Sequence, residues 1–205
     1  GTDSFRTQNI KGAQNAKEDC INILNCWNET VHIQLGEATK ESGKYAALAL
    51  EACTNDALQG KIDCIVTAPI NKYAMTQSGF RYIGHTEYLK DRCQVDQVLM
   101  MMCSDEMKVA LSSGHIPLQN VSSVVSKKKL IRQLQLLIAT LRMDHGIQKP
   151  RIALLGIQPH AGDHGTIGDE DERITKRTVA EMKQNGELVF GPYAADGFFG
   201  SLNYK

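Results

Sequence analysis

Three short loops contain most of the side chains in this 205-residue chain that could do chemistry. They are residues 84–87 (Gly-His-Thr-Glu), 113–118 (Ser-Gly-His-Ile-Pro-Leu) and 158–163 (Gln-Pro-His-Ala-Gly-Asp), and each follows an apolar, strand-like run. In a parallel α/β sheet, ligands bind beyond the carboxyl ends of the strands, because loops and helix N-termini converge there. Imidazoles on such loops suggest a site for a metal and an anion. Only a fold could bring loops this distant in sequence together, which indicates an enzyme.

Two histidines form the candidate metal site. His115 stands close to a proline that restricts the backbone near it. His160 lies between a proline and Gly162, where the absence of a side chain lets the backbone approach a ligand. Two neutral imidazoles suit zinc, cobalt or another borderline divalent cation, but a catalytic site usually has three protein ligands. No third ligand is obvious at a suitable loop, since the spacing of His164 from His160 offers no special geometry.

A candidate anion site surrounds Gly84-His85-Thr86. A helical pattern starts near Thr86, whose hydroxyl is predicted to cap it. The N–H groups and dipole of a helix N-terminus favour phosphate or carboxylate, although an ordinary cap with a solvated His fits the same pattern. Lys72 follows another strand-like run and could pair with an anion as a point charge. Two roles are open for Asp196 in its Ala-Asp-Gly turn: turn formation, or a carboxylate that orients an imidazole.

The elements that must position these residues alternate along the chain. This alternation predicts a parallel sheet with helices on its faces, which is an α/β fold. Residues 1–40 are polar and weakly periodic, so we expect a connecting segment there and the α/β domain over 41–205. Strands are expected at 61–67, 97–103, 107–111, 151–156 and 188–190, and helices at 44–58, 71–77, from about 86, 126–145 and 170–185.

Composition narrows the class of protein. Hydrophobic residues make up 42% of the chain, and 23 basic residues balance 23 acidic ones, so nothing favours nucleic acid as a partner. No apolar run approaches the ~20 residues that a membrane-spanning helix needs, and the first residues lack signal-peptide features. Six cysteines without a Cys-x-x-Cys pair predict reduced thiols in a cytoplasmic protein. There is no Gly-x-Gly-x-x-Gly or Walker loop, so these residues do not predict a Rossmann-type cofactor domain.

Five segments together resemble the 4-hydroxythreonine-4-phosphate dehydrogenase (PdxA) family of vitamin B6 biosynthesis, in the family's order and spacing. They are residues 67–72, 84–88, 115–118, 159–163 and 191–196. The resemblance implies a three-layer α/β/α fold with a mostly parallel sheet, like that of isocitrate and isopropylmalate dehydrogenases. The chain corresponds largely to the second domain of that fold, and we expect it to be a central fragment without the family's N- and C-terminal parts.

The resemblance also implies a reaction. It is the NAD-dependent oxidation of the C3 alcohol of 4-phosphohydroxy-L-threonine, followed by loss of CO₂ to give 3-amino-2-oxopropyl phosphate. A divalent metal (Zn, Mg or Co) held by three histidines polarises the reacting hydroxyl, and the third histidine comes from the other subunit of a homodimer. The site residues implied by the match are His115 and His160 for the metal, His85 and Thr86 for the substrate, and Lys72 and Asp196 as catalytic residues.

The chain also departs from the family pattern. An N-terminal Gly-Asp-Pro-x-Gly-Ile-Gly-Pro-Glu-like motif, a later Met-Tyr-His-Asp-Gln-Gly motif and the Gly-rich segments that help bind NAD are absent. Gln158 and Gly114 stand where Asn and Thr are usual. Two alternatives therefore stay open. One is a paralogous dehydrogenase for 4-phospho-D-erythronate or 4-phospho-threonate, and the other is a non-catalytic remnant that binds phosphate.

Overall fold

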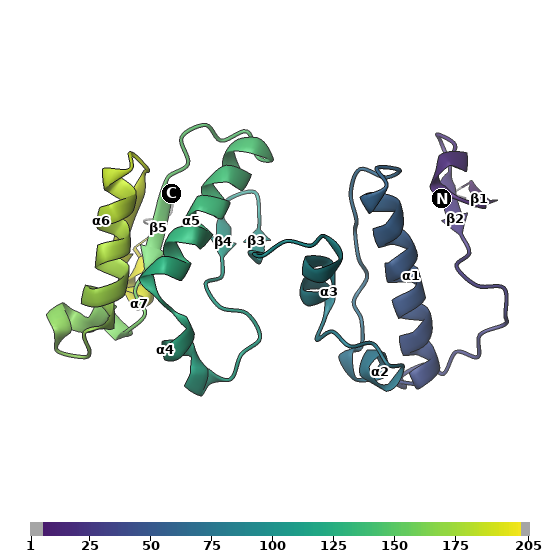
Figure 1. Ribbon diagram of the computed structural model, residues 1–205, viewed down its shortest axis with the longest axis horizontal. Helices are drawn as coiled ribbons and strands as arrows, with labels where there is room; N and C mark the ends of the chain where they lie inside the picture. The colour runs from purple at the N-terminus through teal and green to yellow at the C-terminus, as the bar shows by residue number, and fades with distance from the viewer. Residues whose placement is uncertain (1–5, 202–205) are drawn as a thin grey trace. The chain divides into compact units, whose positions relative to one another are not determined.

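The chain, in a computed structural model that describes residues 6–201, divides into two compact units. The first unit ends at Val98 and the second begins at Leu99. Both combine helices with short strands, and two of the three strand pairs among the described residues are parallel, so the α/β class is confirmed (Figure 1). The predicted boundary near residue 40 remains a prediction. Expectations about residues 1–5 and 202–205 lie outside the described residues.

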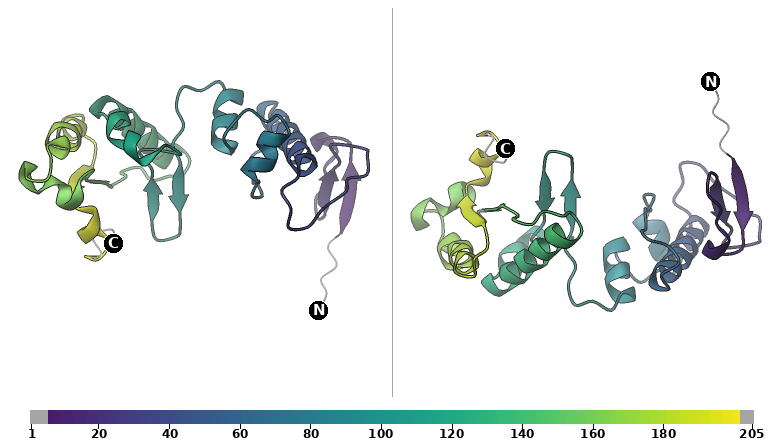
Figure 2. Two further views of the ribbon diagram at one scale, coloured as in Figure 1. Left: turned by 90° about the horizontal axis from the view of Figure 1, so that it is seen from below. Right: turned by 90° about the horizontal axis from the view of Figure 1, so that it is seen from above.

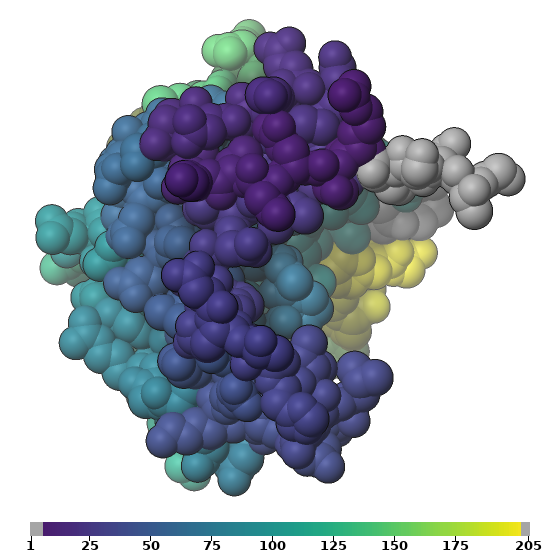
Figure 3. Space-filling view, turned by 90° about the vertical axis from the view of Figure 1, so that its right-hand side faces the viewer, coloured from purple at the N-terminus to yellow at the C-terminus, as the bar shows by residue number. Residues whose placement is uncertain are grey.

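The first unit begins with a pair of strands that the sequence analysis did not predict. They pair in parallel, with Thr7 opposite Ile21 and Ile10 opposite Leu24. Their side chains lie at the surface of this unit (Figure 3). The elements of the unit are β1 (Thr7–Ile10), the 3₁₀ turn η1 (Ala13–Asn15), β2 (Ile21–Leu24), α1 (Lys40–Leu58), α2 (Lys72–Gln77) and α3 (His85–Arg92).

The main helix pair of this unit is α1 with α2. Helix α1 starts earlier than predicted, because the Thr39 side chain caps it by accepting a 3.1 Å bond from the Ser42 N–H. Gly43 lies directly against the second helix, since a Cβ added there would stand only 2.0 Å from the Ala74 carbonyl oxygen. A glycine is therefore needed for the two helices to approach this closely.

The predicted strand over 61–67 is wrong. A strand exists only where a neighbour accepts and donates its backbone hydrogen bonds, and no described segment pairs with this one. Val66 is 92% exposed, so the apolar run that suggested a buried strand is not buried within the described residues. Residues 30–33, whose Thr-Val-His-Ile sequence also has a strand-like composition, form no strand either.

The second unit matches the predicted order of elements more closely. Its antiparallel hairpin (Figure 2) is shorter than expected, and the predicted helix over 170–185 begins as a π-helical turn. The elements are β3 (Met101–Cys103), β4 (Lys108–Ala110), η2 (Leu118–Asn120), α4 (Val121–Val124), α5 (Lys127–Met143), β5 (Ile152–Leu155), η3 (Pro159–Gly165), the π-turn η4 (Asp171–Thr175), α6 (Lys176–Gln184), β6 (Val189–Tyr193) and α7 (Ala195–Phe198).

The core of the second unit lies where α5 and α6 pack on the β5–β6 pair. Ser126 caps α5 by accepting a bond from the Lys129 N–H, and the helix buries a stripe of leucines, Leu130, Leu134, Leu137 and Leu141. The packed side chains are Leu134, Ile138, Val179, Met182 and Val189. This apolar contact fixes the two strands whose ends carry His160 and Asp196. All six cysteines are free thiols, and none of the helices in the described part is long and apolar enough to cross a membrane.

Candidate active site

Two neighbouring parallel strands place His160 and Asp196. In the β5–β6 pair Leu155 lies opposite Tyr193, and the Gly156 N–H extends the pairing with a 2.8 Å bond to the Tyr193 carbonyl. Because parallel strands end at the same edge, the segment after β5 and the segment after β6 leave the sheet together. His160 is in the first of these segments and Asp196 in the second.

The two side chains meet in a direct contact. Nδ1 of His160 lies 2.7 Å from Oδ2 of Asp196, and both side chains are more than half exposed. An imidazole whose Nδ1–H donates to a carboxylate keeps its Nε2 lone pair free on the opposite side of the ring. This is the arrangement in which a protein histidine usually binds a metal. Of the two roles open for Asp196, the contact supports the orienting one.

The turn that presents His160 is left-handed. Five consecutive residues have positive φ angles: His160 (52°), Ala161 (52°), Gly162 (79°), Asp163 (42°) and His164 (54°). Each residue other than glycine costs about 1–2 kcal/mol in this conformation, because its Cβ approaches the carbonyl oxygen. Such strain persists only where the surroundings fix the backbone, and it is concentrated at functional sites.

His115 lies on the segment between β4 and η2, in the same unit as His160. The segment is compact, because the Ile116 N–H bonds back to the Gly114 carbonyl at 2.8 Å, and the His115 side chain is exposed. Over residues 6–201, no three His, Cys, Asp or Glu side chains are grouped so as to hold a metal ion. The donor type of His115 and the Nδ1 bond of His160 fit a divalent metal, but the described residues do not complete a three-ligand set.

Three other predicted site residues gather at the start of α3. The predicted cap is wrong: α3 begins at His85, so Thr86 lies inside the first turn and Gly84 takes the cap position. Gly84 has no side chain that could accept hydrogen bonds from the first N–H groups of the helix. A bound anion can accept these hydrogen bonds instead. The Lys72 Cε lies 3.7 Å from where a Gly84 Cβ would stand, as does Glu87 Oε2. A cation, an imidazole, a hydroxyl and the Glu87 carboxylate therefore surround one helix N-terminus.

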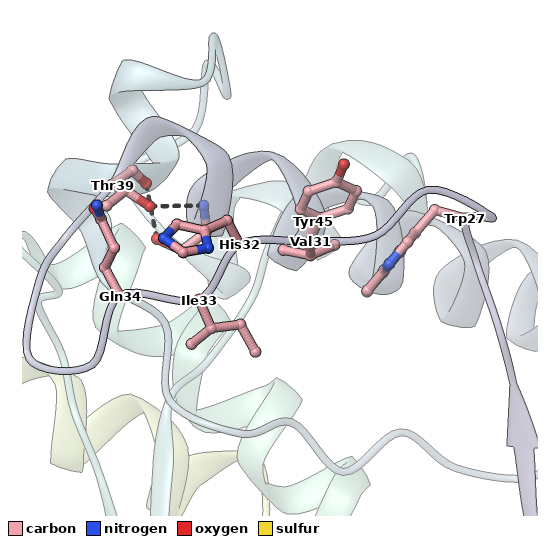
Figure 4. Close-up of a pocket in the computed structure, with 8 residues that line it drawn as sticks. Trp27, Val31, His32, Ile33, Gln34, Thr39 and Tyr45 are labelled. Atoms are coloured by element: carbon pink, nitrogen blue, oxygen red, sulfur yellow. Dashed lines mark hydrogen bonds between the residues drawn. The ribbon is translucent and has the colours of Figure 1, made fainter.

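One cavity in the first unit involves none of the predicted site residues. It measures about 470 Å³, and the rings of Trp27 and Tyr45 that line it have centroids 4.6 Å apart (Figure 4). Its remaining lining comes from the segment before α1 and from the start of that helix. The three loops with candidate chemistry contribute nothing to it.

Comparison with known proteins gives the same family for the whole-chain match and for the individual relatives. The family described as "Pyridoxal phosphate biosynthetic protein PdxA" matches residues 2–205. A 4-hydroxythreonine-4-phosphate dehydrogenase of Bacteroides thetaiotaomicron is 37% identical over 95% of this chain, and one of Sulfurihydrogenibium is 34% identical over 93%. The matches cover 54% and 58% of those two proteins, so the chain spans about half the length of the curated relatives.

Solved structures agree. A crystal structure of 4-hydroxythreonine-4-phosphate dehydrogenase from Klebsiella pneumoniae matches 95% of this chain with a TM-score of 0.78 and 30% identity, over 60% of that chain. A terephthalate 1,2-cis-dihydrodiol dehydrogenase from Burkholderia xenovorans, at 19% identity and a TM-score of 0.61, shares the fold. The match over nearly the whole sequence shows that this chain belongs to the PdxA family of pyridoxal phosphate biosynthetic proteins.

Proposed function

We propose that the intact protein catalyses the NAD-dependent, divalent-metal-assisted oxidation of 4-phosphohydroxy-L-threonine and the decarboxylation that follows. The product is 3-amino-2-oxopropyl phosphate, a precursor of pyridoxal 5'-phosphate. The 2.7 Å contact between His160 Nδ1 and Asp196 Oδ2 is the observation on which the proposal mainly rests. It leaves Nε2 of an exposed imidazole free at the edge where ligands collect in α/β proteins.

In this proposal His115 and His160 are metal ligands, and Asp196 holds the His160 ring in the tautomer that offers Nε2. The third ligand is a histidine of the other subunit of a homodimer, as the resemblance to the family implies. A bound divalent cation (Zn, Mg or Co) supplies Lewis-acid polarisation of the reacting oxygen. We expect the NAD contacts to lie largely outside this chain, as the resemblance to the family implies.

The substrate phosphate binds at the N-terminus of α3 in this account. The first-turn N–H groups and the helix dipole favour an anion, and Lys72 adds a positive charge beside Gly84. His85 and Thr86 provide an imidazole and a hydroxyl at the same helix end. Their work is to bind and orient the substrate, which lowers the entropy cost of the reaction.

The test uses the full-length protein. NADH formation is followed with NAD⁺ and 4-phosphohydroxy-L-threonine, with added Zn²⁺, Mg²⁺ or Co²⁺ and, separately, with a chelator. We expect NADH only when a divalent cation is present. Parallel assays with 4-phospho-D-erythronate and 4-phospho-threonate test the paralogue: faster turnover of either would replace the proposed substrate. No NADH from any of the three substrates would contradict the enzymatic proposal and favour the phosphate-binding remnant.

A further inference from the structure

We propose that Asp171 is a positioning residue, which fixes the backbone entering the left-handed turn and so sets the direction of the His160 imidazole. The inference rests on the proposed metal-binding role of His160. Asp171 is the first residue of the π-turn η4, on a different element from either member of the His160–Asp196 pair. Nothing in the sequence pattern distinguishes it from the acidic residues beside it.

The Asp171 carboxylate accepts three hydrogen bonds in the interior. The N–H of Ile157 donates to Oδ1 and the N–H of Gln158 donates to Oδ2, both at 2.9 Å. The Thr175 hydroxyl donates to Oδ1 at 2.6 Å. Asp171 itself is only 1% exposed. One buried side chain therefore binds two successive backbone N–H groups immediately before Pro159 and the turn.

This pattern needs a carboxylate. Both oxygens of an aspartate accept hydrogen bonds, whereas an asparagine of the same shape has one oxygen and one NH₂ group. In Asp171→Asn that NH₂ would face a donor, either a backbone N–H or the Thr175 hydroxyl. A buried donor left without an acceptor costs about 1–3 kcal/mol, and moving the 157–158 backbone away would relieve that cost.

The turn also packs directly on this carboxylate. A Cβ added to Gly156 would stand 2.9 Å from the Ala161 Cα and 3.3 Å from Asp171 Oδ2. The glycine therefore lets the end of β5, the left-handed turn and the Asp171 carboxylate pack against one another. The neighbouring Glu170 contributes a second contact, because its Oε2 accepts a 2.9 Å bond from the Gln158 side-chain amide. Two adjacent acidic residues thus bind the same short segment.

The direction of His160 depends on that backbone. Its side chain is 66% exposed, so packing does not fix the ring, and its orientation comes from the turn and from Asp196. Each left-handed residue other than glycine is strained, and the strain is relieved when the backbone before the turn is free to move. Loss of the Asp171 bonds would therefore let the turn relax and separate His160 from Asp196.

The experiment compares Asp171→Asn with Asp169→Asn in the full-length protein. Asp169 is the matched control, because its carboxylate lies on the surface, where it bonds to Arg173 Nε at 2.8 Å. Two quantities are measured below the unfolding transition. They are the nitrogen NMR shifts of the His160 imidazole without metal, which report the Nδ1–Asp196 bond, and the Co²⁺ affinity. For Asp171→Asn we expect that NMR signature to be lost and the affinity to fall at least tenfold. Asp169→Asn should keep both.

A second pair of variants applies if Asp171→Asn does not fold. Thr175→Val removes one of the three bonds to the carboxylate at constant size, together with a contact to the helix carbonyl of Asp171. Thr178→Val is its control, because the Thr178 hydroxyl bonds to a helix carbonyl in the same way, that of Ile174, and to no carboxylate among the described residues. The NMR change is expected in Thr175→Val alone. An unchanged His160 signal in the folded Asp171→Asn or Thr175→Val protein would overturn the inference, as would unchanged Co²⁺ affinity where the wild type binds Co²⁺. A wild type that binds no Co²⁺ contradicts the proposed function, and the NMR result then decides the positioning role alone.

Discussion

Nδ1 of His160 lies 2.7 Å from Oδ2 of Asp196, and each residue follows one strand of the parallel β5–β6 pair. The contact joins two loops that are distant in sequence, so the sheet brings them together. The contact also holds Nδ1 of the imidazole in place and leaves Nε2 available, which is the arrangement that a metal-binding histidine needs. The core packing of α5 and α6 on these strands is thus connected to the chemistry at their ends.

Replacing Asp196 tests the orienting role. In Asp196→Ala the His160 ring loses its acceptor and can rotate or change tautomer, so we expect Zn²⁺ or Co²⁺ affinity to fall about 10–100-fold while the protein stays folded. Isothermal titration of the full-length protein measures the affinity. Asp163→Asn, which changes another exposed carboxylate in the turn of His160, is the control and should bind metal normally. Equal affinities of wild type and Asp196→Ala would exclude the orienting role.

Replacing His85 tests the anion site at α3. In His85→Ala we expect KM for the phosphorylated substrate to rise about tenfold, with a smaller change in kcat, because the residue binds and positions the substrate. The helix should persist, since alanine favours it. Steady-state kinetics of the full-length protein give both constants. A variant with an unchanged KM would place the phosphate elsewhere.

Gly156→Ala tests whether the turn needs close packing. The new Cβ would stand 2.9 Å from the Ala161 Cα, which is closer than such atoms approach, so the turn must shift. We expect the free energy of unfolding to fall by about 1–3 kcal/mol, together with weaker Co²⁺ binding. Gly114→Ala is the control for stability, because no atom of residues 6–201 lies within 4 Å of its added Cβ. Chemical denaturation of both variants measures the difference, and equal stabilities would argue against the packing described.

Glu29 gives a prediction about pH. A hydrogen bond from its own backbone N–H, then one from the Tyr45 hydroxyl and one from Lys44, lower the Glu29 pKa from 4.5 to about 2. The folded pKa is depressed, so the stabilisation is complete above about pH 4.5 and is lost as the pH falls toward 2. NMR titration of the Glu29 carboxyl should show the low pKa, and Tyr45→Phe should raise it. A midpoint near 4.5 in the wild type would contradict the contact.

Elements with their own apolar pattern were predictable from the sequence. The leucine stripe of α5 has the helical period, and Ser126 and Gly146 mark its ends, with Gly146 at a φ of 67°. Strands that depend on pairing with a distant segment were not predictable. The β1 and β2 strands are short and half exposed, so nothing local distinguishes them from loops. The run over 61–67 has a strand composition but no pairing neighbour in the described part of the chain.

The site was predictable to a similar extent. Residue types and loop positions pointed to His160 and Asp196, but the role of Asp196 stayed open, because only the strand pairing places it against the imidazole. The left-handed turn could not be anticipated, since only Gly162 among its five residues adopts positive φ without strain. Asp171 was missed for the same kind of reason. Its partners are backbone N–H groups distant in sequence, and every residue type except proline has such a group, so the sequence around them gives no sign of the contact.

Co²⁺ binding by the full-length protein is the most direct measure of the proposed metal site at His115 and His160. The visible absorption of bound Co²⁺ is measured for the wild type and for His115→Ala, His160→Ala and His164→Ala, the last being a neighbouring exposed imidazole in the same turn as His160. We predict that the first two substitutions abolish the absorption and that His164→Ala retains it. Normal Co²⁺ absorption in the His115→Ala or His160→Ala protein would contradict the metal site on which the account depends.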